Sequence, residues 1–207
     1  MILDIHSHNK IAGKHKIVNL SPENYIAIDK PNQFYSIGVH PWNINHDADK
    51  MLDILVSVAH HENIIAIGET GIDLAKSSAP LFRQLIVFKR HIELSELLQK
   101  PLIIHNVKAH DIIIGLRKDL KPSMPWIIHG FRNKPSVAKM LIDAGLYLSF
   151  GEKFNIDSLQ ITPNERILAE TDESESSIDE IIAKLTDASK KNIRELVIQN
   201  AKLIFQI

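Results

Sequence analysis

The sequence contains no cysteine among its 207 residues, which excludes disulfide bonds and thiolate metal ligands. No apolar run approaches the roughly 20 residues that a membrane-spanning helix needs. The first residues also lack the basic segment and the apolar run of a secretory signal. We therefore expect a cytoplasmic protein that has no membrane partner.

The sequence also has no excess of either charge, because its 24 Lys and Arg residues are nearly balanced by 25 Asp and Glu residues. Proteins that hold a nucleic acid by bulk charge usually carry a basic patch or a high pI. A nucleic-acid substrate would therefore have to be bound locally. The hydrophobic content of 44% is that of an ordinary globular protein, and the length predicts one domain over residues 1–207.

From residue 64 onwards, short apolar runs alternate with helical patterns, which is typical of βαβ units and a parallel sheet. Residues 64–67 and 101–104 are expected strands, and residues 81–99 form the expected helix between them, opened by Pro80. The same pattern predicts further strands at 126–128, 146–150 and 166–169, and further helices at 108–118, 135–144 and 189–205.

The first third of the chain is less regular. Residues 1–8, 15–20 and 35–39 are expected strands, and residues 47–61 an expected helix. Between His8 and Tyr35 the chain is too short for two full helices. About eight strands, most of them separated by helices, predict an α/β fold, a (β/α)8 TIM-type barrel that is shortened or irregular in its first βα units.

Polar side chains with metal-binding chemistry follow most of the expected strands. Asp4, His6 and His8 alternate along the first strand and so point the same way. Two imidazoles can hold one ion, but a complete site needs further ligands. In a parallel barrel all strands end on the same face, where active sites of this fold lie. The side chains that end strands are His6, His8, His40, Glu69, His105, His129 and Asp172.

This set suits a pair of divalent cations (Mg, Mn or Zn), because imidazole favours zinc or manganese and carboxylate also accepts magnesium. A carboxylate such as Glu69 can bridge two ions about 3.5–4 Å apart. Such a pair lowers the pKa of a bound water and clamps both oxygens of a displacement at phosphorus. Our hypothesis is that a bridging hydroxide attacks phosphorus while Asp172 accepts its proton.

Six motifs, in chain order, resemble the TatD family of metal-dependent deoxyribonucleases, which are amidohydrolase-like barrels. They are Asp4-Ile5-His6-Ser7-His8, Gly38-Val39-His40-Pro41, Ile67-Gly68-Glu69-Thr70-Gly71-Ile72-Asp73, Pro101-Leu102-Ile103-Ile104-His105, His129-Gly130-Phe131 and Glu170-Thr171-Asp172. The resemblance implies hydrolysis of DNA phosphodiesters from the 3′ end, with Asp172, Glu69 and His40 as catalytic residues. It implies one metal on His6, His8, Glu69 and Asp172, and a second on Glu69, His105 and His129.

For the residues around these ligands, position in the sequence is compatible with more than one role. The resemblance implies that His40 contacts the phosphate, although Gly-x-His-Pro could instead shape a turn. Asp73 is expected to orient the ligands or to cap a loop. Asp4 is expected to orient a neighbour or anchor the strand end. Arg132 and Lys134 follow His129 and are candidates for binding phosphate, or are solvated loop charges.

The sequence also departs from the family pattern. Val107 stands where the family commonly has an arginine, and His91 where it often has a glutamine. A metal-dependent amidohydrolase or esterase acting on a small substrate is one alternative, and a non-catalytic metal-binding relative is another. No lysine ends the strand before His105, which favours phosphodiesters over the C–N bonds that related barrels cleave. The acidic loop from Glu173 to Glu175 would repel a long polyanion at the rim and so favours a short substrate. We expect DNA or a short oligonucleotide as the substrate, and a monomer or a weak homo-oligomer.

Overall fold

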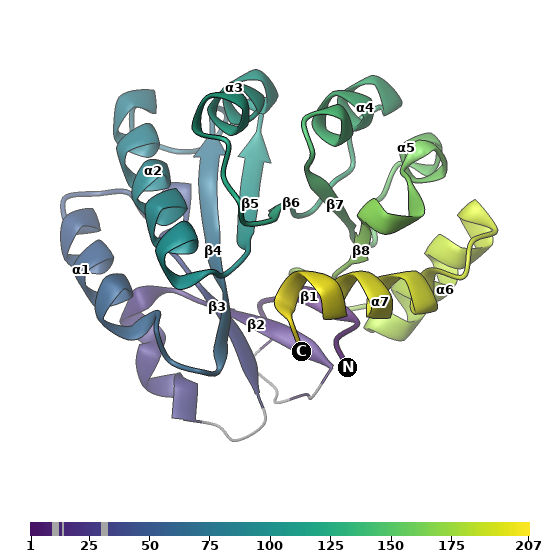
Figure 1. Ribbon diagram of the computed structural model, residues 1–207, viewed down its shortest axis with the longest axis horizontal. Helices are drawn as coiled ribbons and strands as arrows, with labels where there is room; N and C mark the ends of the chain where they lie inside the picture. Colours follow the sequence, from purple (N-terminus) through teal and green to yellow (C-terminus); the bar gives the residue numbers. More distant parts are fainter. Residues whose placement is uncertain (10–12, 14, 30–32) are drawn as a thin grey trace.

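The computed structural model describes residues 1–9, 13, 15–29 and 33–207. Within these residues, eight strands form one sheet whose order follows the chain, and every neighbouring pair is parallel (Figure 1). The strands are β1 (Asp4–Ser7), β2 (Lys16–Leu20), β3 (Phe34–Ile37), β4 (Ile64–Asp73), β5 (Leu102–Val107), β6 (Trp126–Ile128), β7 (Tyr147–Phe150) and β8 (Ile167–Ala169).

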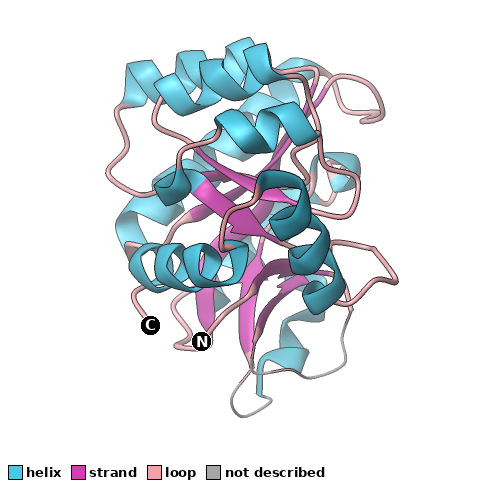
Figure 2. Ribbon diagram, turned by 90° about the vertical axis from the view of Figure 1, so that its right-hand side faces the viewer, coloured by secondary structure: helices cyan, strands magenta, loops and turns pink. Residues whose placement is uncertain are grey.

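Helices surround the strands, and the two chain ends lie side by side at one end of the molecule (Figures 1 and 2). The α-helices are α1 (Ala48–Val58), α2 (Leu81–Leu98), α3 (His110–Leu120), α4 (Pro135–Asp143), α5 (Ile156–Ile161), α6 (Ile178–Ser189) and α7 (Ile193–Phe205). Three 3-10 turns complete the described elements: η1 (Pro22–Asp29), η2 (Pro41–Asn43) and η3 (Asn164–Arg166). The α/β barrel expected from the sequence is confirmed, including its irregular beginning, where η1 takes the place of a helix between β2 and β3.

The buried side chains of β5 alternate between two hydrophobic clusters. Leu102 and Ile104 pack in the larger cluster with the helices, whereas Ile103 packs in a smaller cluster with residues of other strands. Alternation of this kind is expected for a strand that is covered on both faces. His105 is two residues after Ile103 on this strand, so its side chain points to the same face as Ile103. That face is the one turned away from the flanking helices.

The barrel closes between its first and last strands at the ends that carry candidate ligands. The backbone N–H of His8 donates to the carbonyl of Asp172 (3.0 Å), and that of Asp172 donates to the carbonyl of His6 (2.9 Å). Asp172 holds a left-handed backbone conformation (φ 53°) at this point, which aspartate tolerates better than most residues. The seam therefore fixes His6, His8 and Asp172 against one another through the main chain.

The end of the chain differs from the sequence-based expectation. The helix predicted over residues 189–205 corresponds to α7, which begins at Ile193, whereas α6, which ends at Ser189, is not predicted. Helix α6 starts at a capping box in which Ser177 and Glu180 satisfy each other's backbone N–H groups, a signal visible as Ser-x-x-Glu. The short α5 is not predicted either. Asn200 anchors α7 by donating to the carbonyls of Asn164 and Ile167 at 2.8 Å.

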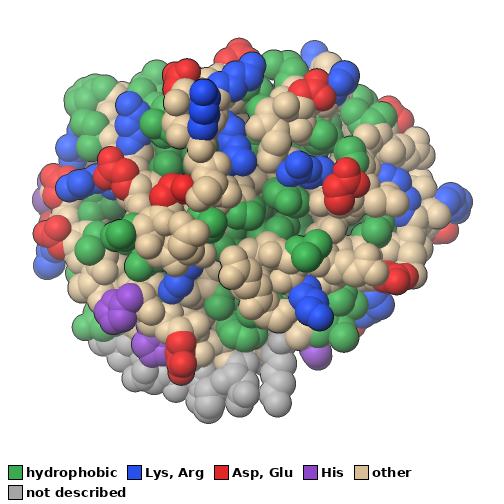
Figure 3. All heavy atoms as spheres, viewed as in Figure 1, with side chains coloured by type: hydrophobic (Ala, Val, Ile, Leu, Met, Phe, Trp, Pro, Cys, Tyr) green, Lys and Arg blue, Asp and Glu red, His purple; other side chains and the backbone are tan. Residues whose placement is uncertain are grey.

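Charges of both signs are mixed over the face drawn in Figure 3, with no large field of one sign. This agrees with the formal net charge of −1. None of the helices in the described ranges is long and apolar enough to cross a membrane.

Candidate metal centre

Glu69 lies at the centre of the histidine cluster. Its side chain is buried (4% exposed), near the middle of β4. Carboxylate oxygen Oε1 faces three imidazole nitrogens: His40 Nε2 at 3.1 Å, His105 Nδ1 at 2.9 Å and His129 Nε2 at 2.8 Å. These histidines follow β3, lie on β5 and follow β6, so residues far apart in the sequence meet at one oxygen atom.

The other oxygen, Oε2, faces a second group at the barrel seam. His6 Nε2 lies 3.3 Å from it and His8 Nε2 3.4 Å. Asp172 Oδ1 completes this group at 3.8 Å from His6 Nε2 and 3.5 Å from His8 Nε2. Three-residue groups drawn from these atoms, among them His6–His8–Asp172 and His40–Glu69–His105, are compact enough to surround a cation. Glu69 thus joins two candidate ion positions, one on each oxygen.

Two glycines allow the strands to approach Glu69 this closely. A Cβ atom on Gly38 would lie 2.7 Å from the Glu69 carbonyl oxygen. A Cβ atom on Gly71 would lie 2.0 Å from the His105 carbonyl oxygen, and its φ of +145° disfavours other residues. The Gly-Val-His and Glu-Thr-Gly segments of the sequence therefore reflect packing at the strand ends.

The proton positions on His105 and His129 fit a bound cation. His105 Nε2 lies 3.1 Å from Asp73 Oδ2, and His129 Nδ1 lies 3.3 Å from Glu170 Oε1. A carboxylate only accepts, so each ring donates its proton there and, when neutral, turns a lone pair towards Glu69. Two lone pairs facing one carboxylate oxygen need a cation between them. Carboxylates that hold the far nitrogen of a metal-bound histidine are common in metal sites.

His6 provides an independent test of whether a cation fits. Its side chain is fully buried, and neither of its ring nitrogens has a hydrogen-bond partner. Leaving a buried polar nitrogen unsatisfied is costly. Nε2 faces Glu69 and Asp172, which are both carboxylates, so a divalent ion bound there would satisfy all three groups.

His40 differs from the other histidines in its proton position. Its Nδ1 accepts a hydrogen bond from the Trp42 backbone N–H at 3.1 Å, so the neutral ring carries its proton on Nε2. That proton is donated to Glu69 Oε1. The ring is therefore arranged as a donor next to the centre, a role that suits contact with an anionic substrate better than ligation.

Electrostatics agree with a site built to hold positive charge. Burial raises the pKa of Glu69, but His129, His6 and His105 outweigh burial and bring that pKa well below its usual range. Burial lowers the pKa of His129, but the charge of Glu69 and hydrogen bonds to Glu170 and Glu69 raise that pKa well above normal. The negative charge that favours protons on these rings would equally favour a metal cation.

Asp4 and Asp73 lie behind the ligands. Asp4 Oδ1 accepts from the Thr171 N–H (3.0 Å) and Oδ2 from the Thr171 hydroxyl (2.7 Å), so Asp4 ties β1 to the chain after β8. Burial raises the pKa of Asp4 to about 6. Asp73 is also buried, but hydrogen bonds from Trp42, Lys76, Ala75 and His105 outweigh that burial and lower its pKa to about 2.

Arg132 and Lys134 are exposed on the loop after β6. In the described part of the chain, neither side chain makes a hydrogen bond or an ion pair with the histidine cluster. Sequence reasoning assigned no role to Glu170, although it directly precedes Thr171-Asp172. Its Oε1 accepts from the Gly130 N–H at 2.6 Å, so it orients both His129 and the turn that follows.

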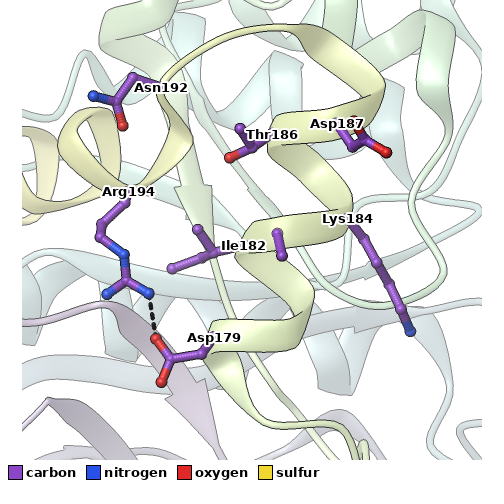
Figure 4. A pocket seen from close by; sticks show the side chains of 8 residues that line it. Asp179, Ile182, Lys184, Thr186, Asp187, Asn192 and Arg194 are labelled. Atoms are coloured by element: carbon purple, nitrogen blue, oxygen red, sulfur yellow. Dashed lines mark hydrogen bonds and ion pairs between the residues drawn. The ribbon is translucent and has the colours of Figure 1, made fainter.

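A surface hollow lies on α6 and α7, lined by residues between 179 and 194 (Figure 4). Arg194 and Asp179 form an ion pair in it, and none of the predicted site residues lines it. The chemistry of the molecule is therefore concentrated at the strand ends.

Comparison with known proteins gives the family. Residues 18–206 match the family described as TatD related DNase. The chain belongs to the TatD family of metal-dependent hydrolases. It is 32% identical over 152 residues to the uncharacterized metal-dependent hydrolase YcfH of Escherichia coli K12, covering 70% of this chain and 57% of YcfH. It is 26% identical over 151 residues to the 3′-5′ ssDNA/RNA exonuclease TatD of Salmonella typhimurium, covering 69% and 58%.

The chain thus spans less than two thirds of the length of each of these two relatives. Among solved structures, the TatD homolog YJJV of Escherichia coli K12 superimposes with a TM-score of 0.88 over 100% of this chain and 98% of that one. At 18% identity this likeness shows the shared barrel.

Proposed function

We propose that this TatD-family protein hydrolyses phosphodiester bonds of DNA or short oligonucleotides from the 3′ end, using two divalent metal ions. The observation that carries the proposal is the placement of Glu69, whose two oxygens face separate groups of ligand atoms. The Salmonella relative is named a 3′-5′ ssDNA/RNA exonuclease, which supports a single-stranded nucleic-acid substrate for this chain.

In this proposal the metal ligands form two groups, one on each carboxylate oxygen of Glu69, and each group holds one ion. Bound there, the ions would supply Lewis acidity, which activates water and stabilises charge on phosphate oxygens. The first ion would be held by His6, His8, Glu69 and Asp172, and the second by Glu69, His105 and His129.

Residues of the chain would do the remaining work. Asp172 is 40% exposed, so it can reach water at the mouth of the site and accept a proton. His40 Nε2–H, now donated to Glu69, can turn to a phosphate oxygen of the substrate. Glu170 and Asp73 hold the rings of His129 and His105 in place, and Arg132 and Lys134 lie on the loop where they could attract the substrate's phosphates.

The test is hydrolysis of an end-labelled single-stranded oligonucleotide with added Mg²⁺, Mn²⁺ or Zn²⁺, beside a phosphomonoester and a dipeptide. A ladder shortening from the 3′ end is expected, with no turnover of the other two. Release of inorganic phosphate alone would indicate a phosphatase, and dipeptide cleavage an amidase.

His105→Ala tests the site itself. The variant should lose metal and activity together, by about tenfold or more, because it removes a ligand of the second ion. His60→Ala, an exposed position on the turn after α1, is the matched control. Full activity and normal metal content in His105→Ala would contradict the proposal.

A further inference from the structure

Trp42 is an exposed aromatic residue beside the candidate metal centre. Its side chain keeps 45% of its surface exposed, whereas Trp126 is completely buried. The ring centroid lies 4.7 Å from that of His40 and 5.8 Å from that of His105. A single exposed aromatic ring is ordinary by itself, but this one lies beside candidate metal ligands.

Trp42 is held in a fixed position. Its Nε1–H donates to Asp73 Oδ2 at 2.6 Å, and the same oxygen accepts from His105 Nε2 at 3.1 Å. A buried carboxylate therefore connects the exposed indole to a predicted metal ligand. A ring that is fixed before substrate arrives loses little conformational entropy on binding.

A cation lies over this ring. The Lys76 ammonium is 4.8 Å from the indole centroid, and the Lys76 backbone N–H donates to Asp73 Oδ1 at 2.9 Å. Lys76 is exposed, so its ammonium can leave the ring and pair with a phosphate. One carboxylate, Asp73, thus organises an aromatic surface and a mobile positive charge at the edge of the centre.

We propose that Trp42 stacks on the nucleobase adjacent to the scissile phosphate, and that Lys76 pairs with the phosphate of that nucleotide. This inference rests on the proposed function and specifies how its substrate is held. Stacking of a base on an aromatic side chain contributes about 1–3 kcal/mol per base to the binding of single strands. Such a contribution matters in a chain whose net charge is −1.

The first experiment compares two single-stranded oligonucleotides that differ only in whether the 3′-terminal nucleotide carries a base or is abasic. Trp42→Ala and Trp42→Phe both remove the hydrogen bond to Asp73, but only the alanine variant removes the ring. The preference in kcat/KM for the base-bearing strand should fall roughly tenfold in Trp42→Ala and stay near wild type in Trp42→Phe.

The second experiment needs no catalysis. The chain has two tryptophans, of which Trp126 is buried, so quenching of fluorescence by a thymidine dinucleotide reports on Trp42. Metal-free wild type should be quenched by the dinucleotide and not by its abasic counterpart. Trp42→Phe, which retains Trp126 alone, should show no quenching.

Equal losses on both strands in Trp42→Ala, or no quenching of the wild type by the dinucleotide, would overturn the inference and leave Trp42 as a support for His40 and Asp73. If metal-loaded wild type cleaves neither strand, the proposed function fails. The fluorescence titration then decides the stacking by itself.

Discussion

Glu69 shows how much chemistry can depend on the environment of a single side chain. It is surrounded by imidazole nitrogens of His6, His8, His40, His105 and His129 at 2.8–3.4 Å. Such crowding around one buried carboxylate has little use in a hydrophobic core, because the rings cannot all donate protons to it. A cation bound between the groups would satisfy the lone pairs that face Glu69.

The role of His91, in contrast to that of Glu69, is revealed only by the structure. Its Nε2 accepts from the Val39 N–H at 2.9 Å, and its Nδ1–H donates to the Val87 carbonyl at 2.8 Å. It therefore holds the chain just before His40 in place. Burial lowers the pKa of His91 to about 4.

This pKa predicts a dependence of stability on pH. The unfolded chain binds a proton near pH 6.5 and the folded one only near pH 4, so stability falls as pH drops through this window. The loss should reach ~3 kcal/mol. His91→Gln keeps one acceptor and one donor, so its free energy of unfolding should depend less on pH across the window.

Urea unfolding at several pH values measures this difference. His60→Gln, at an exposed position, should keep the pH dependence of the wild type. Equal slopes in wild type and His91→Gln would show that His91 is not held neutral by the fold.

At the scale of elements, the seam between β1 and the chain after β8 is the feature on which the first ion position depends. Asp4 bonds both the backbone and the hydroxyl of Thr171 across this seam, which places Asp172 beside His6 and His8. The seam therefore closes the barrel and also positions three residues of the candidate metal centre.

Asp4→Ala should therefore lower both stability and metal affinity. We expect a loss of about 1–3 kcal/mol in the free energy of unfolding, because the Thr171 backbone N–H loses its acceptor, whereas the Thr171 hydroxyl keeps Ser7 as a partner. Metal affinity should fall about tenfold at one ion only. Calorimetric titration with Mn²⁺ measures this, with the exposed Asp53→Ala as control. Unchanged affinity would mean that the seam is fixed without Asp4.

The strand ends were predictable because apolar runs and the polar residues that follow them are local patterns. Alternation along β1 and the parallel topology are enough to place His6, Glu69 and His129 on one face of the barrel. Helix α6 is harder to predict, because the acidic, serine-rich stretch before it resembles a loop. The bond from Trp42 to Asp73 joins residues 31 positions apart, and no periodicity reports such a contact.

For the whole molecule, the balance of charge limits how a nucleic acid can bind. The net charge is −1, and charges of both signs are mixed on the surface in Figure 3. On the described loops that follow β4 and β6, the exposed cations are Lys76, Arg132 and Lys134. The protein should therefore contact few phosphates.

The salt dependence of oligonucleotide hydrolysis tests this point. A plot of log kcat/KM against log salt concentration should have a slope no steeper than about −2, which corresponds to about three phosphate contacts on a single strand. Lys76→Met should make the slope shallower, whereas Lys139→Met, on the exposed face of α4, should not. A slope near −5 would contradict this expectation, because it corresponds to about seven phosphate contacts along an extended basic surface.

If Glu69 joins two ion positions, the number of metal ions bound per chain will depend on its carboxylate. Equilibrium dialysis against Mn²⁺, followed by elemental analysis, should give two ions per chain for the wild type. Glu69→Gln should bind one or none and lose phosphodiester hydrolysis, because the amide supplies a neutral oxygen on one side only. A single ion in an active wild type, or two ions retained in Glu69→Gln, would contradict the account.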